Sequence, residues 1–129
     1  MAKENLLYSK EHEWVLSAGG TATVGVTDYA QHELGDVVFV DLPAAGKELK
    51  KGDPAANIES VKAVSDVYAP VTGKIADVNA KLGANPELVN QDPFGEGWIF
   101  KMSITQASEL DELMDLKKYE EYLKGIAGE

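Results

Sequence analysis

The sequence predicts a mostly β fold, a compact sandwich or barrel of short strands that ends in a helical tail. Turn signals built on Gly, Pro and Asp recur through residues 19–97, and the segments between them are rich in Val, Ile, Thr, Tyr and Phe. From Ser108 onward the apolar residues recur at helical spacing instead. A chain of 129 residues has the length of one ordinary domain, so we expect residues 1–129 to form a single domain.

Seven segments between the turn signals have the composition of strands, because β-branched and aromatic side chains suit a pleated, half-buried surface. Two short motifs, Gly46-Lys47-Glu48-Leu49 and Gly73-Lys74-Ile75-Ala76, open comparable segments and hint at two similar halves. The strands are expected at Glu13–Leu16, Thr21–Val26, Val37–Asp41, Ala55–Glu59, Val64–Tyr68, Gly73–Asn79 and Gly97–Ser103.

Helices are expected in two places. Thr27 is a suitable N-cap, Asp28 places an acid in the first turn and Gly35 is a stop signal, which predicts one short helix. In the tail, Ser108 is the expected N-cap, and Asp115 suits the start of a second segment that ends near Gly125. The tail is therefore one kinked helix or two short ones that pack one face on the sandwich.

Net charge excludes some partners. Asp and Glu total 22 against 12 Lys and Arg, which gives a net charge of −10. Binding to a phosphate backbone depends on Lys and Arg, so no nucleic-acid partner is expected. No apolar run approaches the roughly 18 residues of a membrane span, and the first residues lack the features of a signal peptide. We expect a cytoplasmic monomer without a membrane partner.

The sequence also lacks the usual chemistry of an enzyme. Cysteine is absent, which excludes disulfides, a thiolate nucleophile and Cys-containing metal sites. The two histidines cannot form a three-histidine site; His12 is expected to pack or to hydrogen-bond, and His32 to lie on the surface. No G-x-S-x-G, Walker or calcium-loop motif occurs. We expect no metal site, no catalytic residue and no enzymatic activity of the chain alone.

The most informative segment is residues 55–70, in which two predicted strands flank a tight turn. The turn presents one lysine, Lys62, between Val61 and Ala63. The local pattern Glu59-Ser60-Val61-Lys62-Ala63, followed by Tyr68-Ala69-Pro70, resembles the lipoyl-attachment hairpin of the H proteins of the glycine cleavage system. The resemblance extends in the right order to five further segments: Tyr8–Trp14, Thr27–Gln31, Leu34–Pro43, Pro86–Asn90 and Gly97–Lys101.

The resemblance implies a barrel-sandwich hybrid of two small antiparallel sheets with a lipoyl hairpin, one short helix and a C-terminal helical tail. It also implies lipoate in amide linkage to Lys62, which would supply a redox-active disulfide to a chain without cysteine. A surface cleft is expected to receive the loaded arm. Glu13 and Asp66 are expected to hold its cationic amine there, and Leu34 to cover the arm.

The function implied by the resemblance is that of a non-catalytic carrier in glycine catabolism and one-carbon metabolism. The arm is expected to carry an aminomethyl group from glycine decarboxylase to a tetrahydrofolate-dependent aminomethyltransferase. The resulting dithiol then goes to dihydrolipoamide dehydrogenase for reoxidation. A lipoate ligase, or a lipoyl or octanoyl transferase, is the expected modifying enzyme.

Other functions stay open at this point. Biotin carriers also use a hairpin lysine, but theirs usually lies between methionines, whereas Val61 and Ala63 flank Lys62. Some relatives relay lipoate to 2-oxoacid dehydrogenases. The chain could also be an unmodified interaction module with an acidic face. A Schiff-base enzyme would need a buried lysine with a lowered pKa, which an exposed turn does not readily supply.

Overall fold

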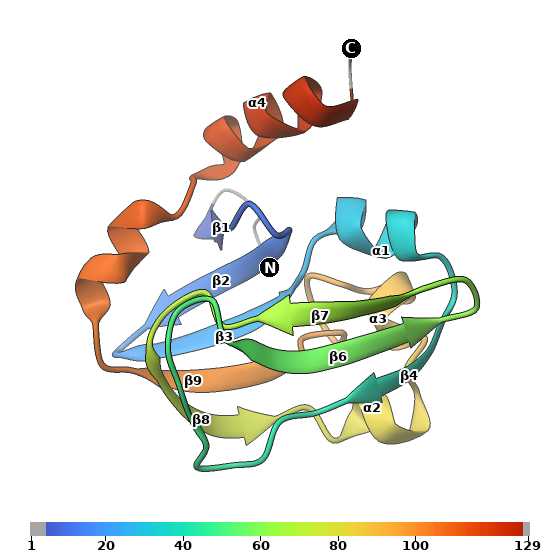
Figure 1. The fold of residues 1–129 in the computed structure, drawn as a ribbon, viewed down its shortest axis with the longest axis horizontal. Helices are drawn as coiled ribbons and strands as arrows, with labels where there is room; N and C mark the ends of the chain where they lie inside the picture. The colour runs from blue at the N-terminus through green and yellow to red at the C-terminus, as the bar shows by residue number, and fades with distance from the viewer. Residues whose placement is uncertain (1–4, 128–129) are drawn as a thin grey trace.

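The computed structural model describes residues 5–127 and contains two antiparallel sheets with one main core between them (Figure 1). The larger sheet has the strand order β1 (Leu7–Tyr8), β2 (Glu13–Ala18), β3 (Thr21–Val26), β9 (Phe100–Ile104), β8 (Gly73–Val78) and β5 (Glu48–Leu49). The smaller sheet has the order β4 (Val37–Asp41), β6 (Pro54–Ser60) and β7 (Val64–Tyr68). The predicted mostly β architecture of two antiparallel sheets is confirmed.

The helices lie around the sheets. They are α1 (Asp28–Leu34), α2 (Lys81–Ala84), α3 (Leu88–Gln91), the 3-10 helix η2 (Ala107–Glu112) and α4 (Leu116–Ala127). Within residues 5–127, none of the helices is long and apolar enough to cross a membrane.

The two repeated motifs of the sequence meet in the larger sheet. Glu48 pairs with Lys74 and Leu49 pairs with Gly73, so β5 and β8 lie side by side and antiparallel. Gly73 is buried where β8 also pairs with β9, opposite Ile104. This close approach of three strands joins the two halves of the chain.

Two hydrophobic clusters stabilise the fold. The main cluster fills the space between the sheets and includes fully buried Val15, Ile58 and Phe100. The second cluster lies between the larger sheet and the tail and is centred on Trp14 and Tyr119. Helix α1 packs Leu34 into the main cluster and is capped by Thr27, whose hydroxyl accepts a hydrogen bond from the Ala30 amide at 3.3 Å. The expected Thr27 cap and Gly35 stop of this helix are confirmed.

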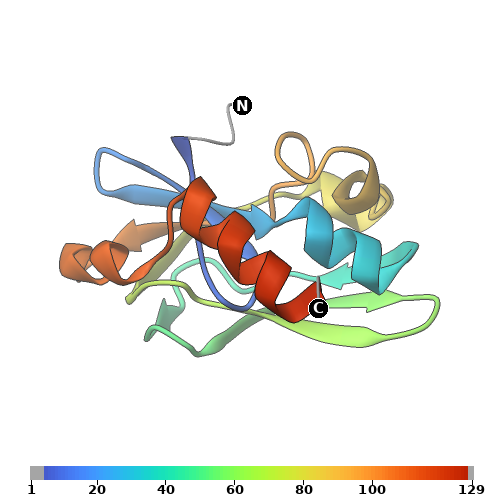
Figure 2. The ribbon, with the colours of Figure 1, turned by 90° about the horizontal axis from the view of Figure 1, so that it is seen from above.

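The tail forms two short helices. Asp115 caps α4, since its carboxylate accepts a hydrogen bond from the Lys118 amide at 2.9 Å, as expected. The expected cap at Ser108 is wrong, because Ser108 lies inside η2 and the preceding cap position is Gln106. Met114, between the two helices, exchanges backbone hydrogen bonds with Tyr8. Figure 2 shows the tail helix crossing over the N-terminal strands as a result.

Tyr119 fixes α4 to the rest of the molecule. Its ring stacks on that of Tyr8 at 4.7 Å, and its hydroxyl is hydrogen-bonded to Thr27 Oγ1 at 2.7 Å and to His12 Nδ1 at 2.9 Å. Burial raises the pKa of Tyr119 to about 12, so the hydroxyl keeps its proton at neutral pH.

Replacing Tyr119 by Phe removes both hydrogen bonds and leaves the ring stacking intact. The free energy of unfolding is therefore expected to fall by about 1–2 kcal/mol in urea titrations. Tyr122 provides the control, because its hydroxyl makes one hydrogen bond within residues 5–127, at 3.2 Å to the Lys10 carbonyl near the surface. An equal loss in Tyr119→Phe and Tyr122→Phe would contradict the account of how the tail is held.

Three features of the secondary structure differ from the sequence prediction. The last strand begins at Phe100 instead of Gly97, because Gly97 is buried in a turn where its amide donates to the Asp92 carbonyl at 2.9 Å. The short helices α2 and α3 and the two-residue strand β1 were not expected from the sequence. Each has too few residues to show a periodic pattern.

Candidate functional site

The turn between β6 and β7 is ordered by one serine. The Ser60 hydroxyl accepts hydrogen bonds from the Ala63 amide at 3.0 Å and from the Lys62 amide at 3.3 Å. The Ser60 amide donates to the Ala63 carbonyl at 2.8 Å, and the Val61 amide donates to the Asp36 carbonyl at 3.0 Å. These bonds hold the turn closed and attach it to the loop before β4. Lys62 therefore sits at a defined point on a firmly held hairpin.

The Lys62 side chain is exposed and extends over the C-terminal end of α1. Gly35 ends this helix with φ +79°, and a Cβ atom added to it would lie 3.2 Å from Lys62 Cε. Neither of the two ion pairs found among residues 5–127 involves Lys62. The amine is therefore accessible to an acylating enzyme, and the stem of the side chain runs toward α1.

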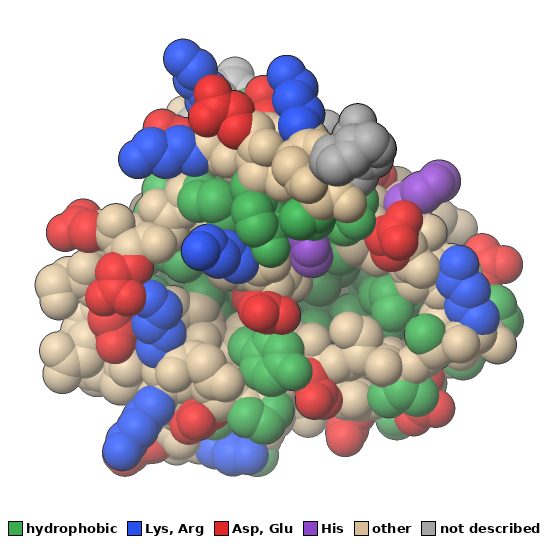
Figure 3. Space-filling model, turned by 45° about the horizontal axis from the view of Figure 1, so that its top comes forward, with side chains coloured by type: hydrophobic (Ala, Val, Ile, Leu, Met, Phe, Trp, Pro, Cys, Tyr) green, Lys and Arg blue, Asp and Glu red, His purple; other side chains and the backbone are tan. Residues whose placement is uncertain are grey.

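A cleft of about 300 Å³ lies between the hairpin and α1. It brings together Glu13, Leu34 and Asp66, which are far apart in the sequence. On this side of the molecule, Figure 3 shows a hollow lined by hydrophobic side chains and bordered by Asp and Glu. The complete lining is Glu11, His12, Glu13, Val26, Tyr29, Ala30, Glu33, Leu34, Ile58, Ala63, Val64, Ser65, Asp66 and Val67.

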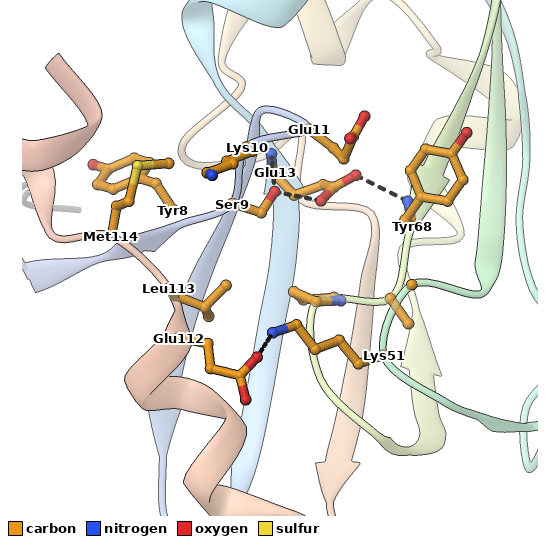
Figure 4. A pocket seen from close by; sticks show the side chains of 13 residues that line it. Tyr8, Ser9, Lys10, Glu11, Glu13, Lys51, Tyr68, Glu112, Leu113 and Met114 are labelled. Carbon is orange, nitrogen blue, oxygen red and sulfur yellow. Dashed lines mark hydrogen bonds and ion pairs between the residues drawn. The ribbon is translucent and has the colours of Figure 1, made fainter. Parts of the chain in front are cut away.

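Glu13 is the buried acid of this cleft, with 1% of its surface exposed. One carboxyl oxygen accepts from the Ser9 hydroxyl at 2.5 Å and the other accepts from the Tyr68 amide at 2.9 Å (Figure 4). Burial raises the pKa of Glu13 to about 7, although both hydrogen bonds favour the ionised form. The carboxyl therefore changes charge near neutral pH, where a small change in its surroundings decides whether it is anionic.

This pKa has a consequence for stability. In the unfolded chain Glu13 titrates near 4.5, and in the folded protein near 7. Between these values the folded state keeps a proton that the unfolded state has released, so the free energy of unfolding falls as the pH rises and levels off above about 7. We expect this loss to be at most about 3 kcal/mol.

Glu13→Gln should lack this pH-dependent part of the unfolding free energy. Its side-chain amide can hydrogen-bond to Ser9 and to the Tyr68 amide but does not titrate. The measurement is urea unfolding of both proteins at several pH values from 4.5 to 8. Their difference in unfolding free energy is expected to change across this range. Parallel curves would show that Glu13 does not titrate there.

The other two predicted cleft residues differ in their surroundings. Asp66 is exposed on β7, where its carboxylate accepts a hydrogen bond from Asn57 Nδ2 at 3.0 Å. Leu34 is nearly buried and belongs to the main core as well as to the cleft wall. The cleft thus has one buried acid, one exposed acid and an apolar wall.

His12 is a cleft residue that the sequence did not assign to the site. Its backbone has φ +70°, and its ring packs against Tyr29 with centroids 4.7 Å apart. Burial lowers the pKa of His12, although Glu11 and Glu33 oppose this, so the ring is neutral at pH 7. His12 hydrogen-bonds to Tyr119, in agreement with the sequence prediction that it packs or hydrogen-bonds. This bond connects the cleft wall to α4. No sequence signal shows that these distant aromatic residues meet.

A second groove of about 470 Å³ lies on the other side of Glu13 (Figure 4). It runs between the turn before β2, the end of β7 and the link from η2 to α4, and an ion pair between Lys51 and Glu112 lies beside it. Glu11 and Glu13 line both grooves. Within residues 5–127, no group of three His, Asp or Glu side chains is arranged to hold a metal ion.

Comparison with known proteins identifies the family. The sequence model of the family "Glycine cleavage H-protein" matches residues 6–126. The chain belongs to this family. It is 57% identical over 115 residues to the glycine cleavage system H protein of Thermotoga maritima, a match that covers 89% of this chain and 93% of the relative. The H protein of Thermus thermophilus is 54% identical over 120 residues, covering 93% and 94% of the two chains.

A solved structure leads to the same conclusion. The crystal structure of a glycine cleavage system H protein from Mycobacterium marinum is similar with a TM-score of 0.85 and 33% sequence identity. The similarity covers 99% of this chain and 100% of the mycobacterial chain. H proteins are the lipoate-carrying component of glycine cleavage and not its catalysts, so the chain is a carrier. The two-sheet fold and the family relationship expected from the sequence are both confirmed.

Proposed function

We propose that the chain is the lipoyl-bearing shuttle of glycine cleavage and that Lys62 is the modified residue. The observation that carries the proposal is an exposed lysine at the tip of a firmly held hairpin, beside a cleft that contains two acids. Attachment forms an amide. The neutral Lys62 amine attacks the carbonyl carbon of an activated lipoyl derivative, such as the acyl adenylate that ATP provides, the bond to the leaving group breaks, and the nitrogen loses a proton.

The residues present fit a lipoyl group. The Lys62 side chain runs toward the C-terminal end of α1, residues of α1 line the cleft, and the cleft has an apolar wall for an aliphatic arm. When bound, lipoate supplies the disulfide and dithiol chemistry that a chain without cysteine lacks. The hairpin contributes a fixed attachment point, which limits the volume the arm must search.

We propose that Glu13 and Asp66 hold the amine of the loaded arm in the cleft and that Leu34 shields it from water. A cationic group near Glu13 favours its ionised form, because an opposite charge lowers the pKa of a carboxyl group. The pair formed would be partly desolvated, which strengthens it. The Glu13 carboxyl is therefore ionised when the cationic amine of the loaded arm lies beside it.

A single exposed acid offers a test of this docking. Asp66→Asn is expected to shorten the lifetime of the aminomethyl-loaded form several-fold, followed as the decay of its mass increment in the absence of the aminomethyltransferase. Asp111→Asn, which changes an exposed acid in η2 far from the cleft lining, is the matched control. Equal lifetimes for Asp66→Asn and the wild type would argue against the role of Asp66.

We further propose three enzyme partners: glycine decarboxylase, the tetrahydrofolate-dependent aminomethyltransferase and dihydrolipoamide dehydrogenase. The test is a reconstituted reaction with glycine, tetrahydrofolate and NAD, in which each protein is left out in turn. We expect NADH formation only when the lipoylated chain and all three enzymes are present. If the lipoylated chain is not loaded by glycine decarboxylase but passes lipoate to a 2-oxoacid dehydrogenase, the relay function would replace the shuttle.

The extent of the carrier unit is also part of this proposal. The family match over residues 6–126 supports one carrier domain for residues 1–129. The monomeric state and the cytoplasmic location stay predictions from the sequence.

A further inference from the structure

Exposed hydrophobic side chains gather around the attachment lysine. Five large hydrophobic residues among residues 5–127 are strongly exposed, and four of them lie on β4, β7 or the turn that carries Lys62. These four, which we call the tip patch, are between 49% and 69% exposed. The tip patch consists of Val38, Phe39, Val61 and Val64.

The strand register explains why the four residues are neighbours. Phe39 of β4 pairs with Glu59 of β6, and Glu59 pairs with Val64 of β7, so the three side chains form a row across the smaller sheet. Val38 lies at the irregular position between Val37 and Phe39, one step closer to the hairpin tip. The patch is therefore built into the sheet that ends at Lys62.

The segments that carry the tip patch are acidic, and Glu59 lies within the patch itself, between Phe39 and Val64. Residues 33–41 and 54–68 contain five acids and a single base, Lys62 itself. A patch of exposed apolar side chains marks a place where another molecule binds, and acids in and beside it favour a partner surface of the opposite charge. All five acids are exposed: Glu33, Asp36, Asp41, Glu59 and Asp66.

We infer that the tip patch is the surface by which the enzyme that acylates Lys62 recognises this chain. The inference rests on the proposed function, because it assumes that Lys62 is lipoylated. The reach of the side chain decides between possible partners. An acylating enzyme must bring the Lys62 amine itself into its active site, so its surface must meet the turn and the adjoining sheet. The other partner enzymes act on the end of a much longer arm and can do so without covering β4.

The chemistry of the partner surface follows from that of the patch. It should present an apolar depression around the entrance that receives the lysine, and Lys or Arg side chains at its rim. Burial of Phe39 at the centre of such an interface would make it the residue on which affinity depends most, since aromatic side chains supply large contact areas.

The test measures acylation of the unmodified chain by a lipoate–protein ligase with lipoate and ATP, followed by intact mass. We expect the double variant Val38→Ser/Phe39→Ser and the single variant Val61→Ser each to lower kcat/KM at least about tenfold, mainly through a higher KM. Ile126→Ser is the matched control, because Ile126 on α4 is the fifth exposed hydrophobic residue and lies outside the patch. Its kcat/KM should stay within about twofold of the wild type.

Two further readouts separate recognition from folding. The patch variants should keep the urea midpoint of the wild type. After prolonged incubation to complete acylation, their lipoyl disulfide should also be reduced by NADH and dihydrolipoamide dehydrogenase, in the reverse of the reoxidation reaction, at the wild-type rate. Patch variants that are acylated as fast as the wild type would overturn this inference and leave the proposed function intact. A wild-type chain that is not acylated at Lys62 would overturn both.

Discussion

Replacing Lys62 by Arg is expected to abolish glycine cleavage and to leave the fold intact. The guanidinium group stays protonated at any accessible pH and offers no neutral amine for amide formation. Lys62 is exposed and takes part in no ion pair among the described residues, so its replacement removes no stabilising contact of that kind. We expect activity at the background level in the reconstituted reaction and no lipoyl mass increment.

Lys74→Arg controls for the substitution itself, because Lys74 is an exposed lysine on β8, away from the hairpin. This variant should be lipoylated and active like the wild type. Circular dichroism and urea unfolding should agree for all three proteins. Normal glycine cleavage by Lys62→Arg would remove Lys62 from the proposed function.

Gly73→Ala is expected to cause a large loss of stability, about 3 kcal/mol in the free energy of unfolding. A Cβ atom at this position would lie 2.0 Å from the Ser103 carbonyl oxygen and 3.0 Å from its carbon. Both atoms belong to the backbone of β9, which pairs with β8 here, so neither can move without shifting the sheet. Only a residue without a side chain fits this approach of the two strands.

Gly83→Ala provides the matched control for this prediction. Gly83 lies in α2, and an added Cβ atom there would meet no atom within 4 Å. The substitution should leave the unfolding free energy unchanged or raise it by up to about 1 kcal/mol. Urea titrations followed by tryptophan fluorescence measure both variants. Similar stability of Gly73→Ala and Gly83→Ala would show that β8 and β9 are packed less closely than described here.

The sequence predicts most of this fold because its local signals agree with one another. The hairpin around Lys62 was predicted from its turn and flanking strands, and α1 from its Thr27 cap and Gly35 stop. The Asp115 cap was also predicted correctly. These features depend on neighbouring residues only, which is why a sequence pattern can reveal them.

Features that depend on tertiary contacts were beyond the sequence. Ser108 has the chemistry of a cap, yet η2 begins two residues earlier than that cap predicts, at Ala107, with Gln106 in the cap position. The buried carboxyl of Glu13 accepts a hydrogen bond from the amide of Tyr68, which lies far along the chain. His12 meets Tyr119 only because α4 folds back over β1. Each of these outcomes follows from long-range packing, which a local sequence pattern cannot reveal.

The cleft was predicted in part from the sequence. Glu13, Leu34 and Asp66 were assigned to one site by resemblance to a family, and the structure places all three around one cavity. Their chemical environments were not predictable, since the exposure of Asp66 and the burial of Glu13 depend on how β7 lies against the turn before β2. The role of the cleft in holding a loaded arm stays a prediction.

The central claim is tested most directly by the intact mass and peptide map of the protein purified from lipoate-replete cells, before and after incubation with glycine and glycine decarboxylase. The account predicts a lipoyl increment confined to the peptide that contains Lys62, followed by an aminomethyl increment on the same peptide. A protein that carries no modification, even with an active lipoate ligase present, would contradict it.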